Sequence, residues 1–265
     1  MKVKIEVINQ AGEVMRSKAF EQRGYLDYIA TYRQGDSIRV SVDQPEQYLV
    51  VQMDESLNPS LIYLKEKTWE YKIPIDEKAR EAYPIKAFLG DKHYISARLA
   101  EDNEISQYQN LALNPHDQKQ DSGAYPHASA NVETRNDSTF FARNAIDGVI
   151  ANEDHGPYPY QSWGINQQAD ACLRVDFGRL VEIDKIALVL RGDYPHDSYW
   201  TQVTLVFSDG STEVVPLKKL LEPQIIKIEQ KRIAWLEIKE LIKAEDDSPF
   251  PALTQIEVYG KNIRS

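Results

Sequence analysis

Hydrophobic and polar residues alternate in short runs along most of the chain. In the first part, "KVKIEV" alternates, and "GDSIRVSV" follows a Gly-Asp turn and places Ile38, Val40 and Val42 on one side. "YLVVQM", "LIYL", "WEYKIP" and "KHYISARLA" come at short intervals. A period of two is typical of strands with one buried face, and closely spaced short strands favour an antiparallel sandwich. The exception is "PIDEKAREAYP", where good helix formers between two prolines predict a turn or two of helix.

The second half of the chain also predicts strands. "ACLRVDFG" directs Leu173, Val175 and Phe177 toward a core, and "VEIDKIALVL" is apolar enough to be buried on both faces. "WTQVTLVFSDGSTEVVPL" alternates into Asp-Gly, which predicts a tight hairpin. Further strands are expected in "PQIIKIE", "RIAWLEIK" and "LTQIEVYG", and a short helix in "FFARNAIDG". The pattern therefore predicts an all-β protein.

The character of the sequence changes between about residues 101 and 126. This stretch is polar, rich in Asn, Gln, Asp, Gly and Pro, and shows little periodicity. Domain junctions commonly fall in such segments, and 265 residues are enough for two domains with separate cores. We therefore expect a β-rich N-terminal domain over residues 1–106 and a second domain over residues 107–265. The role of the first domain stays open at this point.

Composition and charge exclude several classes of partner. The formal net charge is -10 and no run of Lys or Arg is longer than a pair, which disfavours binding to nucleic acid or an anionic membrane. No segment approaches the roughly 20 apolar residues that cross a bilayer. The N-terminus lacks a leader pattern, so a cytoplasmic location is expected, or a secreted one if the start was trimmed. The single cysteine, Cys172, excludes an internal disulfide and a cysteine-based zinc site.

Three connecting segments share an unusual chemistry. "RGDYPHDSYW" (191–200) joins two strong strands, so residues 192–198 must form a loop, and "NEDHGPYPYQSWG" and "KAEDDSPFP" also mix acids, rings and prolines. Stiff loops lose less entropy when they bind a ligand. The Arg-Gly-Asp tripeptide could suggest adhesion, but Arg191 ends a strand. No Gly-rich phosphate loop, HExxH pair or Gly-x-Ser-x-Gly motif occurs in the chain.

From about residue 108 onward, eight short features follow one another in an order that resembles a known family. They are "NLAL", "SGAYPHASA", "ARNAIDG", "SWG", "LRVDFGRLVEIDKIAL", "FSDGS", "WLEIK" and "LTQIEVYG". This part of the chain resembles the discoidin family, the coagulation factor V/VIII C-type domains, with their bacterial carbohydrate-binding-module relatives. The resemblance implies an eight-stranded, galactose-binding-like jelly roll, which the strand pattern places after a smaller β-sandwich-like domain. It also implies a ligand held by loops at one end.

The family's binding modules hold sugars by a stacking ring and a few polar side chains. A sugar has an apolar face that packs on an aromatic ring, and hydroxyls that need hydrogen-bonding partners. Trp163 and Trp200 are expected in the core. A non-catalytic carbohydrate-binding protein is therefore the leading hypothesis. The candidate ligand contacts are Tyr158, Tyr160, Arg191, Asp193, His196 and Asp197.

The resemblance further implies a structural calcium ion beside the Asp-Gly motif. The matching positions are Asp147 in "NAIDG", Glu257 in "QIEVYG" and the carbonyl of Asn144. Hard oxygen ligands on irregular backbone suit calcium. The chain departs from the family after Asp147, where relatives have a short run and this sequence has the much longer "GVIANEDHGPYPYQSWG". His155 with His196 could also form half of a metal site.

Two other classes of function remain open on the sequence. An enzyme, most plausibly a glycosidase or lyase, could use two carboxylates drawn from Asp193, Asp197, Asp246 and Asp247. A protein-interaction or assembly module would instead bury the loop surface, and a homo-oligomer is compatible with it. The identity of the sugar is not readable from the residues.

Overall fold

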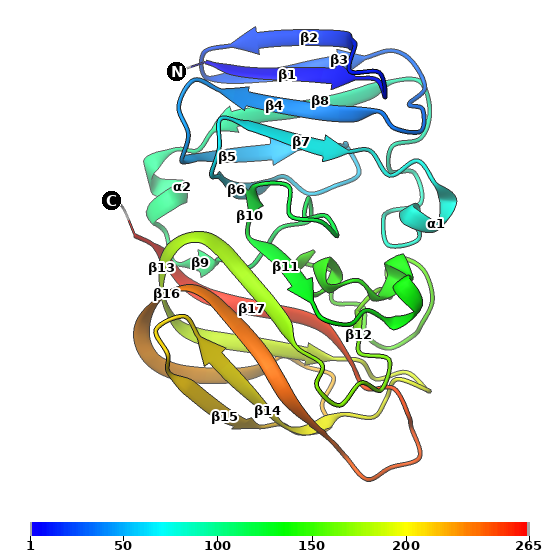
Figure 1. The fold of residues 1–265 in the computed structure, drawn as a ribbon, viewed down its shortest axis with the longest axis vertical. Helices are drawn as coiled ribbons and strands as arrows, with labels where there is room; N and C mark the ends of the chain where they lie inside the picture. The colour runs from blue at the N-terminus through cyan, green and yellow to red at the C-terminus, as the bar shows by residue number, and fades with distance from the viewer. Residues whose placement is uncertain (1, 264–265) are drawn as a thin grey trace.

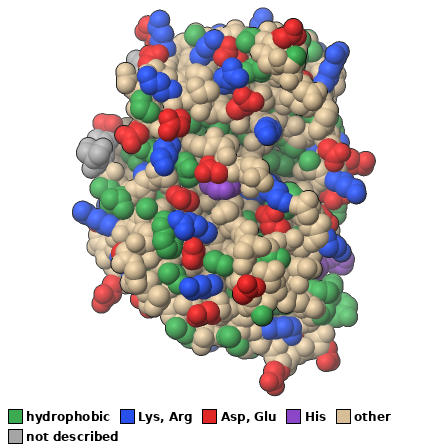
Figure 2. Space-filling view, viewed as in Figure 1, with side chains coloured by type: hydrophobic (Ala, Val, Ile, Leu, Met, Phe, Trp, Pro, Cys, Tyr) green, Lys and Arg blue, Asp and Glu red, His purple; other side chains and the backbone are tan. Residues whose placement is uncertain are grey.

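The computed structural model describes residues 2–263 as two β-rich units stacked along the long axis of the molecule (Figure 1). Nearly all regular structure is antiparallel strand, which confirms the predicted all-β class. Among the described residues, no helix combines the length and apolar character needed to cross a membrane. Acidic and basic side chains are interspersed over the face shown in Figure 2, so that face carries no large patch of one sign.

The first unit is a sandwich of two sheets. Their strand orders are β2-β1-β4-β7 and β10-β6-β5-β8-β3. The side chains of Ile38, Val40 and Val42 are buried between them, as the alternation predicted. The strands are β1 (Val3–Ile8), β2 (Val14–Phe20), β3 (Arg23–Tyr28), β4 (Ser37–Val42), β5 (Gln47–Gln52), β6 (Ser60–Leu64), β7 (Thr68–Lys72), β8 (His93–Leu99) and β10 (Ala124–Tyr125).

Two short helices interrupt this β structure. The proline-bracketed segment forms α1 (Glu77–Arg80), as expected, and the Asp76 carboxylate caps it by accepting hydrogen bonds from the backbone amides of Lys78 and Ala79. The helix α2 (Asp102–Ser106) follows β8. Because α1 lies at the side of the first unit that faces the second, its C-terminal end reaches the loops described below (Figure 1).

The chain crosses between the units more than once. β9 (Gln109–Asn110) pairs with a strand of the second unit, but the chain then returns, and β10 pairs with β6 of the first unit. The Trp69 Nε1 atom donates to Ser122 Oγ at 3.0 Å, and the Gln118 side chain pairs with both backbone groups of Lys72. Residues 118–125 thus complete the first unit. A domain boundary near residue 106 remains a prediction.

The second unit is built on one eight-stranded antiparallel sheet. Its strands, besides β9, are β11 (His127–Ala130), β12 (Trp163–Gly164), β13 (Leu173–Leu190), β14 (Trp200–Phe207), β15 (Thr212–Pro216), β16 (Gln224–Lys243) and β17 (Ala252–Asn262). The predicted eight strands are confirmed. The Asp-Gly hairpin joins β14 and β15, with Gly210 at a φ of 86°.

Two long strands fold this sheet over itself into two layers. Residues 173–176 of β13 pair with β11 and with residues 235–238 of β16, whereas residues 181–190 pair with β17 and with residues 224–233. Gly178, at a φ of 67°, lies at the irregularity between the two parts. The sequence suggested two separate strands here, and the structure joins them through this glycine.

The core of the second unit lies between the two layers. Leu173, Val175 and Phe177 are fully buried, as predicted, and so are Trp163 and Trp200. Three 3-10 helices close one side of this core: η1 (Thr134–Asn136), η2 (Ser138–Phe140) and η3 (Ala142–Ile146). Of these, η3 lies within "FFARNAIDG", the segment for which a short helix was expected.

Candidate functional site

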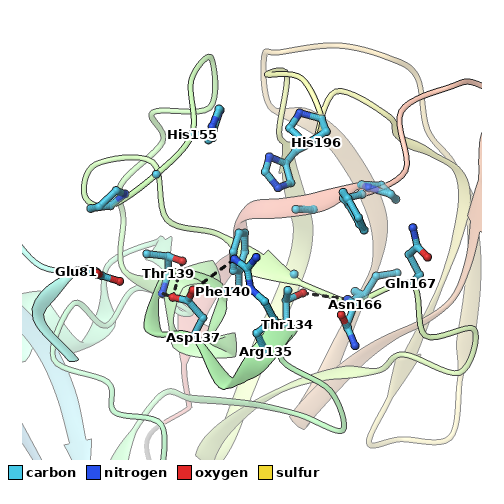
Figure 3. A pocket seen from close by; sticks show the side chains of 18 residues that line it. Glu81, Thr134, Arg135, Asp137, Thr139, Phe140, His155, Asn166, Gln167 and His196 are labelled. Carbon is cyan, nitrogen blue, oxygen red and sulfur yellow. Dashed lines mark hydrogen bonds and ion pairs between the residues drawn. The ribbon is translucent and has the colours of Figure 1, made fainter. Parts of the chain in front are cut away.

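A cavity lies where loops of the second unit meet the end of α1. Its volume is about 480 Å³. Figure 3 shows its polar residues arranged around an open centre, with η1 and η2 below and His155 and His196 above. Its lining side chains and backbone come from Glu81, Thr134, Arg135, Asp137, Thr139, Phe140, His155, Gly156, Pro157, Gly164, Ile165, Asn166, Gln167, Pro195, His196, Phe250, Pro251 and Ala252.

All three loop segments selected from the sequence reach this cavity. His155, Gly156 and Pro157 come from "NEDHGPYPYQSWG", Pro195 and His196 from "RGDYPHDSYW", and Phe250 and Pro251 from "KAEDDSPFP". These segments are distant in sequence, and the sandwich brings their ends to one rim. The three segments therefore meet at one cavity.

The backbone at the cavity floor is held in an uncommon conformation. Arg135 and Asn136 have φ values of 54°, and Asn166 and Gln167 have values of 49° and 58°. They are four of the seven non-glycine residues with positive φ in the part of the chain that the structure describes. The backbone amide of Asn166 donates to Thr134 Oγ1 at 3.0 Å, which ties the two loops together. Such strained residues concentrate at ligand sites, because the surrounding structure must hold them there.

Aromatic rings form one side of the cavity. The centroid of the His196 ring lies 5.7 Å from that of Phe140 and 6.3 Å from that of Phe250. The His155 ring is 5.9 Å from His196. The Arg135 guanidinium lies 5.6 Å from the centre of the Phe140 ring. This series of rings offers an apolar surface next to polar groups.

The two histidines are anchored from behind by one buried carboxylate. Asp193 Oδ2 lies 2.9 Å from His196 Nδ1 and 3.4 Å from His155 Nδ1. Its Oδ1 atom accepts from the guanidinium of Arg191 at 2.6 Å. Burial opposes ionisation of Asp193, but the hydrogen bonds from His196 and Arg191 outweigh it and hold its pKa below the ordinary value. The carboxylate thus stays charged and fixes the imidazole rings.

Arg191 organises these loops from inside. Its side chain is 1% exposed, and it donates to the carbonyls of Tyr160 and Asp154 and to Ser162 Oγ, at distances between 2.6 and 3.1 Å. A place in the loop of residues 192–198 predicts that Asp193 projects into solvent, and this prediction is wrong. That residue is buried because its carboxylate neutralises the buried guanidinium.

The other candidate ligand contacts lie outside the cavity lining. Tyr158 is half-buried, and its backbone amide donates to the carbonyl of Glu81 at 2.6 Å, while Tyr160 is half-buried on the same loop. Asp197 Oδ2 pairs with Lys219 Nζ at 3.2 Å. Of the six candidate contacts, His196 alone is among the lining residues.

The carboxylates considered for catalysis are not poised as an acid–base pair. A hydrogen bond from Ser248 holds the pKa of Asp197 below its ordinary value, and one from Lys243 does so for Asp246. A general acid needs a raised pKa. Asp247 is exposed, and none of the four carboxylates of that hypothesis lines the cavity.

Sequence reasoning missed most of the polar cavity residues. Asn tolerates the left-handed conformation, so Asn166 carried a local turn signal, whereas nothing in the pattern around Glu81 pointed to a site. Asp137 caps η2 by accepting from Thr139, and it pairs with Arg135 at 3.4 Å. None of these residues lies in the three loop segments that the sequence singled out.

The residues expected to hold calcium do not fit the ion. The carbonyl of Asn144 and the carboxylate of Asp147 do converge, but both accept from Gln255 Nε2, at 2.6 and 2.8 Å. Glu257 accepts instead from the Tyr259 hydroxyl at 2.9 Å. Within residues 2–263, no group of three or more His, Cys, Asp or Glu side chains is arranged to hold a metal. His155 and His196 are therefore not part of such a group.

Comparisons with known proteins complete this description. No model of a protein family and no curated protein matches the chain. Among solved structures, the chain is similar to the family 32 carbohydrate-binding module of C. perfringens NanJ, in complex with galactose (17% identity, 58% of this chain, 99% of that one, TM-score 0.42). It is also similar to the lectin domain of lectinolysin with Lewis b antigen (16% identity, 58% of this chain, 98% of that one, TM-score 0.42). A third similar structure is a fucose-binding module of Streptococcus pneumoniae, SpX-3 (14% identity, 58% of this chain, 98% of that one, TM-score 0.40). These values identify no family.

Proposed function

We propose that this cavity binds a carbohydrate and that the protein is a non-catalytic sugar-binding protein. The observation that carries the proposal is the row of rings formed by Phe140, His196 and Phe250 beside exposed side-chain amides. Sugar rings pack their apolar C–H face on aromatic surfaces and offer hydroxyls around the edge. The cavity volume of about 480 Å³ suits a small ligand.

The polar groups around the rings suit the sugar hydroxyls. Asn166 and Gln167 are exposed at the floor and carry both donors and acceptors. The pair of Arg135 and Asp137 adds a guanidinium and a carboxylate. Nδ1 of His155 and of His196 lies toward Asp193, and in this proposal Nε2 of each ring binds a sugar hydroxyl. Groups held in place before binding lose little entropy on contact.

The first unit supplies part of the wall. The Glu81 carboxylate lies in the cavity lining and has no hydrogen-bonding partner among residues 2–263. The hydrogen bond from the Tyr158 amide to the Glu81 carbonyl joins this wall to the loop that contains His155. In this proposal, the N-terminal unit supports one side of the sugar site and adds an acceptor to it.

The proposal is tested by titrating a panel of mono- and oligosaccharides against the wild type and three variants. Phe250→Ala removes a ring that is 40% exposed, so its effect on folding is small. We expect about a fivefold to tenfold loss of affinity from the lost ring contact, and a similar or larger loss for Phe140→Ala. Tyr194→Ala is the matched control, because Tyr194 lies in the same loop as His196 but outside the cavity lining.

Two results would contradict the proposal. If Phe250→Ala and Phe140→Ala both bind the same glycan as tightly as the wild type, the sugar site lies elsewhere. If a bound glycan is cleaved during incubation with wild-type protein, followed by chromatography of the products, the non-catalytic part is wrong.

A further inference from the structure

A second constellation lies behind the cavity, where η3 meets β17. Gln255 is 2% exposed, and its Nε2 atom lies 2.6 to 2.8 Å from three oxygens, namely the carbonyls of Asn144 and Thr254 and Oδ1 of Asp147. Its Oε1 atom accepts from the Gly148 amide at 3.0 Å. One side chain thus joins the last strand to the loop that follows η3.

The oxygens of this constellation converge as in a buried cation site, but Gln255 Nε2 lies where a cation would lie. Two backbone carbonyls and a carboxylate converge, which is the kind of oxygen set that calcium prefers. The atom at their meeting point is an amide nitrogen, which carries two hydrogens and no lone pair for a metal. A cation could enter only if the amide turned over, and Gly148 would then lose its acceptor.

Both carboxylate oxygens of Asp147 already have hydrogen-bond donors. Gln255 Nε2 donates to Asp147 Oδ1 at 2.8 Å. Gln161 Nε2 donates to Asp147 Oδ2 at 2.7 Å, so both carboxylate oxygens accept from side-chain amides. These partners leave little for a divalent ion to add.

We propose that the side-chain amide of Gln255 takes the place of the calcium ion that the resemblance to discoidin domains implies, so that this loop is held without metal. The loop matters to the cavity, since Asn144 Nδ2 donates to the carbonyl of Ser138, which begins η2, and to that of Ser162, which precedes β12. Gln255 therefore supports the floor of the cavity from the side away from the ligand. The inference does not depend on what the cavity binds.

The test compares the thermal unfolding of the wild type and Gln255→Glu in EDTA and in millimolar calcium. For the wild type we expect the two midpoints to agree within about 1 °C. Gln255→Glu places a second carboxylate beside Asp147 and removes the donated hydrogen bonds, so its midpoint should fall in EDTA. Calcium should then raise it by about 4 °C or more, because the ion binds the folded state alone.

Two results with folded protein would overturn the proposal. A wild-type midpoint that rises with calcium overturns the proposal, and so does a Gln255→Glu variant that folds but does not respond to calcium. If Gln255→Glu does not fold, calcium titration of the wild type by calorimetry decides, with heat of binding as the contrary result. Glu257→Gln is the control and should leave the calcium response of the wild type unchanged.

Discussion

The ion pair beneath the cavity gives the sharpest test of the structure. Asp193→Asn keeps the shape of the side chain but removes the charge that faces Arg191. The two side chains are 5% and 1% exposed, and their closest oxygen and nitrogen atoms are 2.6 Å apart. The variant also places an amide where Oδ2 accepts from His196.

The expected loss of stability follows from burial. Removing one partner of a buried pair leaves an uncompensated charge, which costs about 3 to 5 kcal/mol. Asparagine keeps one oxygen that can accept from Arg191, so we expect about 3 kcal/mol at pH 7. Loosened histidines should also weaken any sugar binding, but the change in unfolding free energy is the primary result.

Urea denaturation at pH 7, followed by tryptophan fluorescence and circular dichroism, measures this loss. Asp197→Asn is the matched control, since Asp197 lies in the same loop but forms a partly exposed pair with Lys219. Such a pair contributes at most about 1 kcal/mol. If Asp193→Asn unfolds at the same urea concentration as Asp197→Asn, the assigned role of the buried pair is refuted.

The pH dependence has a definite sign. The folded-state pKa of Asp193 is lowered, so its contribution is present above its unfolded value of about 3.9 and is lost as pH falls through the folded value. The difference in stability between the wild type and Asp193→Asn should therefore shrink below about pH 4. A difference that grows with acidity would contradict the assignment.

Two further predictions concern other parts of the fold. Gly260 of β17 has no room for a Cβ atom, which would overlap the carbonyl of Glu182, so Gly260→Ala should cost about 3 kcal/mol in urea denaturation. Gly210→Ala, at an open turn with positive φ, should cost about 1 kcal/mol, and equal losses would contradict the packing at Gly260. The bidentate hydrogen bond from Arg98 lowers the pKa of Glu104 to about 2. NMR titration of Glu104 should show this pKa, and a midpoint near 4.3 would refute the prediction. The stabilising contribution of the ionised Glu104 is lost as the pH falls from about 4.3 toward the folded-state pKa.

The strands were predictable because their burial alternates. Val40 and Val175 are buried for the reason that the pattern indicates, namely that alternate side chains point into a core. The return of β10 to the first unit was not predictable, since two residues carry too little periodicity to indicate a partner. The continuity of β13 depends on a glycine whose φ angle the pattern does not reveal.

The site was predictable at the level of loops and not of residues. Acids, rings and prolines marked three segments that the structure brings to one cavity, because a sandwich must connect its strands at its ends. The sequence "RGD" does not show that the Arg191 side chain points into the protein. Because the buried guanidinium pairs with Asp193, that carboxylate is not exposed to a ligand. Gln255 lies two positions before Glu257 in β17, so the strand period gives both the same face and does not show which of them reaches the loop after η3.

The return of residues 118–125 to the first unit bears on how such a protein can evolve. A module that is exchanged between genes as a cassette must carry all of its own strands. Here a cut at residue 106 would leave the first sandwich without its edge strand β10 and without the Ser122 partner of Trp69. Recombination at that point would yield two damaged halves, so the two units are expected to be inherited together.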